Sequence, residues 1–310
     1  MLALTAAPGR PGDVELREVS DPSPGEHEAL VEVHAISLNR GETRRLPEMQ
    51  DGELTGWDLA GTVRTAAADG SGPSQGARVV GLVGRGAWAQ LAAVDTDMLA
   101  PLPEGVGFEQ AATLPVAGLT ALRALDVIGG VVSRRVLVTG ASGGVGRFAV
   151  QLARLAGGRV TGVSSSPERA RGLRELGADE VIGELAADGP GTWDGIVEGV
   201  GGRTLAAALQ RVAPGGTVVS FASSDTEAVA FPTRSFFGRA PGARLYGFYL
   251  FAELDRGESG ASGLARLARL VAEGRLECSI DHVASWRQAP EAIAMLLERR
   301  IAGKAVLQLD

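Results

Sequence analysis

Hydrophobic and polar residues alternate along the first third of the chain. Val31, Val33 and Ala35 stand between polar neighbours, and this period of two is typical of a half-buried strand. The same pattern predicts further short strands at residues 59–63, 78–83 and 87–91. Loops rich in glycine and proline separate them, so we predict a compact β-barrel over residues 1–112.

The period changes near residue 108, where helices are predicted over residues 108–114 and 115–127. From Arg134 onward, apolar strands alternate with amphipathic helices. The strands are predicted at 136–139, 159–163, 180–182, 195–200, 217–221 and 244–250, and the helices at 145–156, 167–176 and 204–212. Such repeated units predict an α/β domain with a parallel sheet covered by helices on both faces. Two more helices, over 263–275 and 290–300, and a strand over 305–309 complete the pattern.

The composition allows two domains and excludes some classes of function. The chain has 310 residues, 45% of them hydrophobic and 22% charged, which is enough for a sizeable core. Its net charge of −7 argues against nucleic-acid binding as the main activity. The one cysteine, Cys278, excludes an intrachain disulfide and is expected to be a free thiol in or near a core. No cationic leader opens the chain and no apolar run reaches about 18 residues, so we expect a soluble, cytoplasmic protein without a membrane segment.

A glycine-rich turn joins the predicted strand at 136–139 to the helix that follows it. Its register is Ala141-x-Gly143-x-x-Gly146, the dinucleotide-binding pattern with alanine in place of the first glycine. The free amides and the positive end of the helix form a site for a diphosphate. We therefore expect the residues of this turn to contact a cofactor, namely Ala141, Ser142, Gly143, Gly144, Val145 and Gly146. The alternative is a tight strand–helix turn that binds nothing.

The end of the next predicted strand indicates which dinucleotide is bound. A carboxylate there usually binds the ribose 2′-hydroxyl of NAD, but this chain has Ser164 and Ser165, followed by Arg169. Small hydroxyls leave room for a 2′-phosphate, and an arginine can supply the matching charge. We predict NADPH rather than NADH. The alternatives are that the serines cap a helix beside Pro167 and that Arg169 lies on a solvated helix face.

Five motifs together resemble the medium-chain dehydrogenase/reductase family, in particular its zinc-free quinone oxidoreductases. The motifs are residues 140–146, 114–120 (Leu-Pro-Val-Ala-Gly-Leu-Thr), 213–218 (Ala-Pro-Gly-Gly-Thr-Val), 35–39 (Ala-Ile-Ser-Leu-Asn) and 303–307 (Gly-Lys-Ala-Val-Leu). The resemblance covers nearly the whole chain. It implies a GroES-like domain built from residues 1–112 and 258–310, a Rossmann domain over 113–257 and an active site in the cleft. It also implies a homodimer joined through the strand at 244–250.

One sequence triplet indicates whether the protein can bind the catalytic zinc of its zinc-dependent relatives. Zinc-dependent members have Gly-His-Glu where this chain has Gly56-Trp57-Asp58, and an indole cannot act as a zinc ligand. The cysteine-rich structural zinc lobe is absent from the sequence as well. We therefore expect a metal-free protein.

The resemblance also implies a set of site residues. Asn39 matches the family's pocket asparagine, and Glu42 stands where many relatives have aspartate; with Arg40 they form the expected catalytic group. Lys304 matches a lysine near the cofactor phosphates, although it could instead be a solvated lysine at the start of the last strand. Phe248 could reach the cofactor or could only pack at an interface. The remaining expected cofactor contacts are Thr120, Val200, Gly201, Phe221 and Ala222.

One departure from the family concerns proton delivery. Many relatives have a pocket tyrosine shortly after the asparagine, but the two tyrosines of this chain are Tyr246 and Tyr249. Water, Asn39, Arg40 or Arg44 would have to take that role. The resemblance implies hydride transfer from NADPH to a quinone or an α,β-unsaturated carbonyl. The alternatives are an enoyl-thioester reductase and a protein that binds NADPH but has lost its chemistry.

Overall fold

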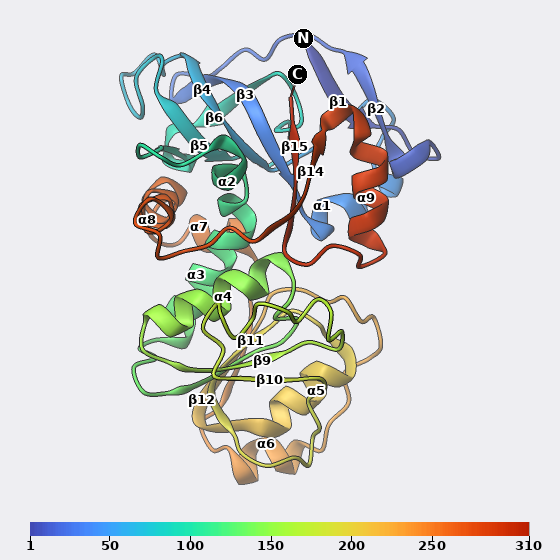
Figure 1. Ribbon diagram of the computed structural model, residues 1–310, viewed down its shortest axis with the longest axis vertical. Helices are drawn as coiled ribbons and strands as arrows, with labels where there is room; N and C mark the ends of the chain where they lie inside the picture. Colours follow the sequence, from blue (N-terminus) through green and yellow to red (C-terminus); the bar gives the residue numbers. More distant parts are fainter. Residues whose placement is uncertain (310) are drawn as a thin grey trace. The chain divides into compact units, whose positions relative to one another are not determined.

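The computed structural model describes residues 1–309 and divides into two compact units (Figure 1). The first unit joins Met1–Leu119 to the chain from Leu254 onward, and the second is Thr120–Glu253. The two boundaries therefore fall after Leu119 and before Leu254, where the sequence places them after residues 112 and 257. The first unit is discontinuous, because the second is inserted within it.

A mixed sheet forms the first unit. Its path runs β14–β15–β3–β4–β5–β7, with β6 paired to β3, and β1 and β2 pair separately. The strands are β1 (Leu2–Ala6), β2 (Val14–Glu18), β3 (Glu28–Leu38), β4 (Asp58–Thr65), β5 (Arg78–Leu82), β6 (Leu91–Asp95), β7 (Leu99–Pro101), β14 (Ile280–Ser285) and β15 (Lys304–Gln308). β15 pairs antiparallel with β3, so that Ala305 faces Leu38. This pairing joins the N-terminal and C-terminal segments of the first unit at the start of β15.

The helices of this unit cover the same sheet. They are α1 (Arg40–Arg45), α2 (Phe108–Ala112), α8 (Gly260–Ala272) and α9 (Ala289–Leu297), and a π-helical turn spans Leu114–Gly118. Trp88 and Trp286 are fully buried in the hydrophobic core of this unit. Cys278 is a buried free thiol, as predicted, and burial raises its pKa to about 11.

The strand predicted at 87–91 is wrong, because the strand lies at Leu91–Asp95 instead. Gly86 has a φ of +92°, which turns the chain just before the predicted strand. The amide of Trp88 then donates to Thr55 O, and its carbonyl accepts from the amide of Leu4. These bonds hold Trp88 in the core as part of a loop.

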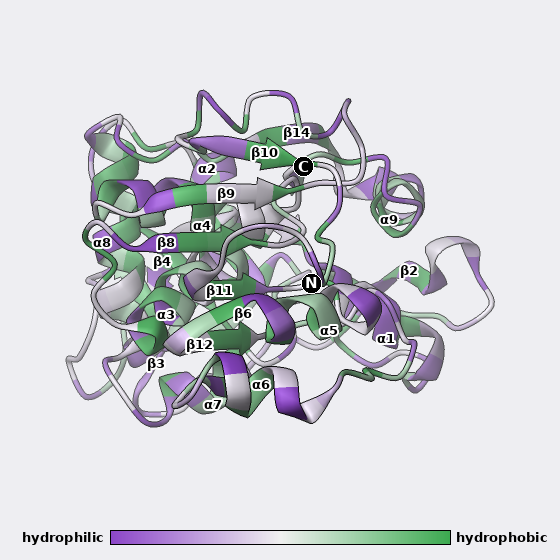
Figure 2. Ribbon diagram, turned by 90° about the horizontal axis from the view of Figure 1, so that it is seen from below, coloured by the Kyte–Doolittle hydropathy of each residue, from purple (hydrophilic) through white to green (hydrophobic). Residues whose placement is uncertain are grey.

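The second unit contains the predicted parallel sheet. Within residues 1–309 the sheet has the order β10–β9–β8–β11–β12–β13, and every pair of neighbours is parallel. The strands are β8 (Arg135–Val138), β9 (Arg159–Val163), β10 (Glu180–Ile182), β11 (Trp193–Glu198), β12 (Val212–Ser220) and β13 (Arg244–Gly247). Figure 2 shows hydrophobic residues along β8, β11 and β12. The strand order reverses between β8 and β11, which confirms the predicted doubly wound α/β fold.

Helices connect these strands. They are α3 (Leu119–Ile128), α4 (Gly144–Leu155), α5 (Gly202–Arg211) and α6 (Thr233–Arg239), and α7 (Leu250–Leu254) follows β13. α4 packs on β8 and β9, and α5 packs on β11 and β12. In the part of the chain that the structure describes, no helix is long and apolar enough to cross a membrane.

The helix predicted over 167–176 is wrong, because this segment is a succession of hydrogen-bonded turns. The amide of Ala170 donates to Ser166 O, and the amide of Leu176 donates to Gly172 O. Gly172 has a φ of +81°, a left-handed conformation that interrupts a right-handed helix. The predicted strand 244–250 likewise ends at Gly247, and Leu250 already begins α7.

Candidate functional site

The glycine-rich turn of the second unit lies between the end of β8 and the start of α4. Gly140 has a φ of +58°, and a Cβ placed on Gly146 would lie 2.4 Å from Gly140 O. Both positions therefore require glycine, one for its backbone angle and the other for the close approach of helix and strand. Gly143 is the N-cap of α4, so the first amides of this 12-residue helix belong to Gly144, Val145 and Gly146. Amides at a helix N-terminus suit a phosphate.

The serines that follow β9 join this turn. Ser164 Oγ donates to Ser142 Oγ at 3.1 Å, and both side chains are buried. Ser165 is exposed and Arg169 is half-buried on the turn segment beyond it. Ser166 Oγ accepts from the amide of Arg169 at 3.3 Å. Ser166 therefore caps a turn and not a helix, because the predicted helix is not formed.

Arg147 holds this turn segment, a role that we did not predict. Its side chain is buried on α4, and Nη2 donates to Arg169 O at 2.9 Å and to Arg171 O at 3.0 Å. Nε donates to Ser142 O at 3.4 Å, within the glycine-rich turn. One guanidinium thus fixes the predicted phosphate-binding residues to the predicted diphosphate site. A helical pattern gives no signal for such a bond, since an arginine on α4 is usually solvated.

Glu198 fixes the loop after β11 through hydrogen bonds. We did not predict this role from the sequence. The amides of Val200 and Gly201 donate to Glu198 Oε1 at 2.8 and 3.0 Å. The carbonyl of Val200 accepts from the amides of Ser224 and Asp225, in the loop after β12. Burial raises the pKa of Glu198. The loops after β11 and β12 are therefore tied to each other.

The other expected cofactor contacts are Phe221, whose amide donates to Glu198 O, and Ala222, Thr120 and Phe248. Phe221 is half-buried against Gly199, where an added Cβ would meet its ring at 2.4 Å. Ala222 is exposed, Thr120 is buried at the start of α3, and Phe248 is buried beyond β13. Contact of any of these four residues with a cofactor stays a prediction.

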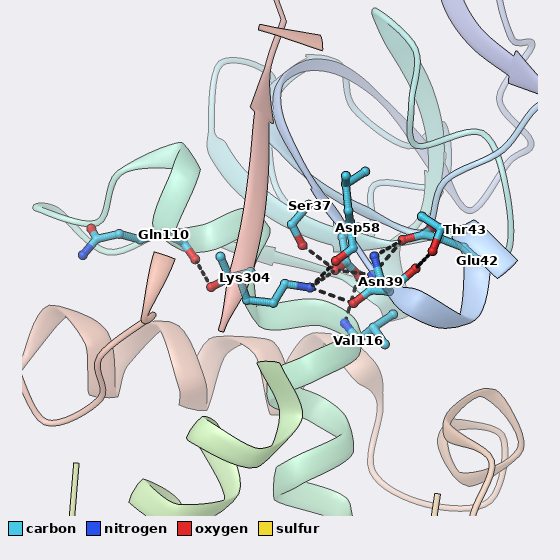
Figure 3. A network of polar contacts seen from close by, with 10 residues as sticks. Ser37, Asn39, Glu42, Thr43, Asp58, Gln110, Val116 and Lys304 are labelled. Carbon is cyan, nitrogen blue, oxygen red and sulfur yellow. Dashed lines mark hydrogen bonds and ion pairs between the residues drawn. The ribbon is translucent and has the colours of Figure 1, made fainter. Parts of the chain in front are cut away.

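The first unit contains a second network, built on Asn39, Glu42, Asp58 and Lys304 (Figure 3). Asn39 directly follows β3 and is the N-cap of α1, and Glu42 lies in the first turn of that helix. Asp58 opens β4 and Lys304 opens β15. All four side chains are buried. The pairing of β15 with β3 brings Lys304 beside Asn39, although the two are 265 residues apart in the sequence.

Asn39 is the centre of this network. Its Nδ2 donates to Glu42 Oε1 at 2.9 Å and to Asp58 Oδ2 at 2.8 Å. Its Oδ1 accepts from Lys304 Nζ at 2.7 Å. Both hydrogens of the side-chain amide are therefore engaged by carboxylates. A substrate oxygen could bind this amide only by displacing one of them.

Lys304 is not solvated, so that alternative is wrong. Its ammonium is 3% exposed and donates to Leu38 O at 3.1 Å, to Asn39 Oδ1 and to Asp58 Oδ2 at 3.4 Å. An ammonium group has three hydrogens, so these three oxygens satisfy it. A contact of Lys304 with cofactor phosphates stays a prediction, and it would require one of these bonds to be exchanged.

Asp58 was noted in the sequence only as part of a triplet that cannot bind zinc. The structure shows that its carboxylate accepts from Ser37 Oγ at 2.8 Å and, through Oδ1, from the amide of Val116 at 2.9 Å. Val116 belongs to the π-helical turn within the 114–120 motif. Gly56, two residues earlier, has a φ of +95°, and a Cβ there would meet the Trp88 ring at 2.1 Å. Asp58 therefore links three of the motifs that carried the family resemblance, namely 35–39, 114–120 and 303–307.

Glu42 is the acid of this network with a strongly shifted pKa. Burial, and then the negative charge of Asp58, raise its pKa to about 8 against the hydrogen bonds of Asn39 and the charge of Lys304. Oε1 accepts from the backbone and side-chain amides of Asn39, while Oε2 is buried without a hydrogen-bond partner among residues 1–309. Two carboxyl groups with one ammonium leave an excess negative charge, which a proton on Glu42 removes.

A zinc ion does not fit this set of residues. Trp57 offers no lone pair, and the oxygens of Asp58 already accept from an ammonium, an amide group and a hydroxyl. No group of three or more His, Cys, Asp or Glu side chains that could hold a metal occurs over residues 1–309.

Comparison with known proteins agrees with this fold. Residues 25–104 match the alcohol dehydrogenase GroES-like domain, and residues 144–258 match a family described as zinc-binding dehydrogenase. The chain is 31% identical to a quinone oxidoreductase of Pseudomonas aeruginosa over 97% of both proteins. It is also 34% identical to the polyketide synthase protein NorB of Streptomyces orinoci, over 90% of this chain and only 13% of NorB.

A solved structure is similar over the whole chain. It is the mycobacterial protein Rv1454c complexed with NADPH, with a TM-score of 0.88, 26% identity and coverage of 99% of this chain and 100% of that one. The fold and the quinone oxidoreductase of near-equal length define the family. The chain belongs to the medium-chain dehydrogenases/reductases, within their quinone oxidoreductase group.

Proposed function

We propose that this protein is an NADPH-dependent, zinc-independent oxidoreductase that reduces a quinone or an α,β-unsaturated carbonyl. Relatives named quinone oxidoreductase support the class of reaction, and the NADPH complex of a structural relative supports the cofactor. The misfit of zinc to Trp57 and Asp58 supports metal independence.

The observation that carries the proposal is the contact between Ser164 and Ser142. It joins the end of β9, where a carboxylate would select NAD, to the turn that suits a diphosphate. A hydroxyl pair at this place accommodates a 2′-phosphate, which a carboxylate would repel. Arg169 follows on the segment that Arg147 fixes, and it supplies the positive charge that a phosphate requires.

Different residues of the chain would bind the cofactor and position the groups around it. The first amides of α4 would bind the diphosphate, and Ser164, Ser165 and Arg169 the 2′-phosphate. Bound NADPH supplies a hydride from its nicotinamide ring. Hydrogen bonds with Glu42, Asp58 and Lys304 hold the Asn39 side chain in one orientation.

Quinones suit this arrangement better than other acceptors. The chain lacks a tyrosine after Asn39, and both side-chain amide hydrogens of Asn39 are already engaged. A reduced quinone takes its protons readily from solvent, so it depends least on a donor fixed in the protein. Arg40, at the first position of α1, remains the cation proposed to assist at the same place.

The direct test measures NADPH oxidation with a quinone, with an enone and with an enoyl thioester, in the presence and absence of a chelator. We expect turnover with the quinone or the enone, unchanged by the chelator. Tight NADPH binding without turnover of any acceptor would favour a binding protein that has lost its chemistry. Loss of activity with the chelator would overturn zinc independence.

Reduction of an enoyl thioester is the second candidate. It is favoured by the similarity to NorB, a protein of a polyketide synthase system, and by a relative named trans-enoyl reductase. Turnover restricted to the thioester in the same assay would establish this alternative.

We further propose a homodimer formed at the edge of the second unit's sheet. β13 is the last strand in the sheet order, and Leu245 on it is 50% exposed. Tyr249, just beyond the strand, is 62% exposed. A second copy of the chain can continue the sheet and cover both residues. Light scattering should give twice the chain mass, and Leu245→Lys should give a monomer; a monomeric wild type would overturn the proposal.

A further inference from the structure

We propose that Glu198 is the positioning residue of the cofactor site, because its carboxylate fixes three loops at one edge of the parallel sheet. The inference rests on the proposed function in that NADPH is the ligand. Glu198 ends β11 and is 0% exposed. Such burial of an acid is unfavourable unless hydrogen bonds compensate it.

The hydrogen bonds of Glu198 come from three neighbouring strand ends. Oε1 accepts from Thr139 Oγ1 at 3.1 Å, after β8, and from the amides of Val200 and Gly201, after β11. Oε2 accepts from Ser220 Oγ at 3.5 Å, at the end of β12. β8, β11 and β12 are adjacent in the sheet and parallel. Their carboxyl ends therefore lie along one edge, which is where open parallel sheets bind ligands.

Thr139 connects Glu198 to the glycine-rich turn. It directly precedes Gly140, and its Oγ1 also accepts from the amide of Gly199 at 3.0 Å. The Thr139 hydroxyl thus connects the turn that suits a diphosphate to the loop after β11. Without this bond the turn would keep its glycines but would lose its link to the neighbouring loop.

The chemistry of the site requires a carboxylate rather than an amide. Three donors converge on Oε1, and a charged carboxylate oxygen attracts all three. The oxygen of a glutamine carries no net charge, so it holds the same three donors more weakly. The two backbone amides are held by the loop, and Thr139 would be the donor released. Glu198→Gln and Thr139→Val should therefore both remove the bond between these two side chains, and Thr139→Val should also remove the bond from the Gly199 amide.

The test is an equilibrium titration of NADPH against the wild type, Glu198→Gln, Thr139→Val and the double variant, followed by nicotinamide fluorescence. We expect Glu198→Gln to weaken NADPH binding about tenfold and Thr139→Val to weaken it at least as much, and we expect the double variant to be no weaker than Thr139→Val. In steady-state assays the KM for NADPH should rise by the same factor, while kcat at saturating NADPH stays within about threefold.

Arg211→Met is the matched control. Arg211 is another buried charged side chain of the second unit, and it holds the loop before β11 through Ala186 O at 2.6 Å, Gly191 O at 2.8 Å and Pro190 O. This loop lies at the opposite end of the strand from Glu198. Arg211→Met should lower the melting temperature but leave the Kd for NADPH unchanged.

Two outcomes would overturn the inference. One is a Glu198→Gln protein with a lowered melting temperature and an unchanged Kd, which is the behaviour expected of Arg211→Met. The other is additive weakening in the double variant, which would show that Glu198 and Thr139 act separately. A wild type that binds NADPH but reduces no acceptor would contradict the proposed function alone, whereas one that binds no NADPH would contradict both.

Discussion

The ammonium of Lys304 lies 3.4 Å from the carboxylate of Asp58, although 246 residues separate them in the sequence. The two side chains are 3% and 0% exposed. In this environment the attraction is strong, but so is the cost of removing either partner, because the other charge stays buried. Lys304 is also the only lysine of the chain, so a substitution there removes every lysine side chain from the protein.

Removing the Lys304 charge should be strongly destabilising. We expect Lys304→Met to lower the free energy of unfolding by about 3–5 kcal/mol, because Asp58 then keeps an uncompensated negative charge. Urea denaturation measures this difference. Arg300→Met is the control, since the Arg300–Glu298 pair is exposed and should contribute less than about 1 kcal/mol. Equal losses in the two variants would contradict a buried, paired Lys304.

Glu42 should make stability depend on pH. Its pKa rises from the ordinary 4.5 to about 8 on folding, so between these values the folded chain holds a proton that the unfolded chain has released. Stability is therefore fully present below about pH 4.5 and falls as the pH rises toward 8, by an amount on the order of a few kcal/mol. Urea denaturation at pH 5 and pH 8 should show this fall in the wild type and not in Glu42→Gln.

A control for that experiment comes from an acid shifted in the other direction. A hydrogen bond from Arg17 lowers the pKa of Asp51, so its carboxylate stays ionised between pH 5 and pH 8, and Arg17 does not titrate in this range. Asp51→Asn should keep the wild-type fall in stability over this range. The same fall in wild type and Glu42→Gln would show that Glu42 is ionised in the folded chain.

The nucleotide preference should reverse with one substitution. Ser164→Asp places a carboxylate beside the proposed 2′-phosphate, so NADPH binding should weaken about tenfold or more while NADH binding is kept or improved. Fluorescence titration with each nucleotide measures the ratio. Ser74→Asp, at an exposed serine of the first unit, adds the same charge elsewhere and should leave the ratio unchanged. Equal affinity of the wild type for the two nucleotides would refute the proposed phosphate site.

The glycine-rich turn should not accept a methyl group at Gly146, its last glycine. In Gly146→Ala the Cβ would lie 2.4 Å from Gly140 O and 2.6 Å from Ala141 Cα, so α4 must move away from β8. We expect a loss of about 1–3 kcal/mol in the free energy of unfolding, with weaker NADPH binding. Gly84→Ala has open space around the added Cβ and should be close to neutral. A crystal structure of Gly146→Ala with α4 unmoved would contradict this account.

Local patterns predicted the parts of the fold that depend on local chemistry. The strand at 159–163, the glycine-rich turn and the helix after it follow from apolar periods and from glycines that nothing else can replace. The turns at 167–176 were missed because the apolar spacing there is helical. The left-handed angle of Gly172 interrupts the helix, and a glycine inside a helical pattern does not reveal its angle.

The buried networks could not be predicted in the same way. Asp58 and Lys304 meet only because β15 pairs with β3, and Glu198 meets Thr139 only because β11 lies beside β8. Each of these residues has an ordinary local context, because Asp58 and Lys304 begin strands, Glu198 ends one and Thr139 directly follows one. Only the sheet register decides that their charges are buried and paired.

The insertion of the second unit within the first has a consequence for the order of events during synthesis. Thr120–Glu253 is continuous, so all of it is made before Lys304. At ordinary rates of translation the 246 residues between Asp58 and Lys304 take on the order of ten to fifty seconds to make. During that time the second unit can complete its sheet on the ribosome, whereas the Asp58 carboxylate stays hydrated and β3 keeps an open edge. The part of the protein that is translated first therefore closes last.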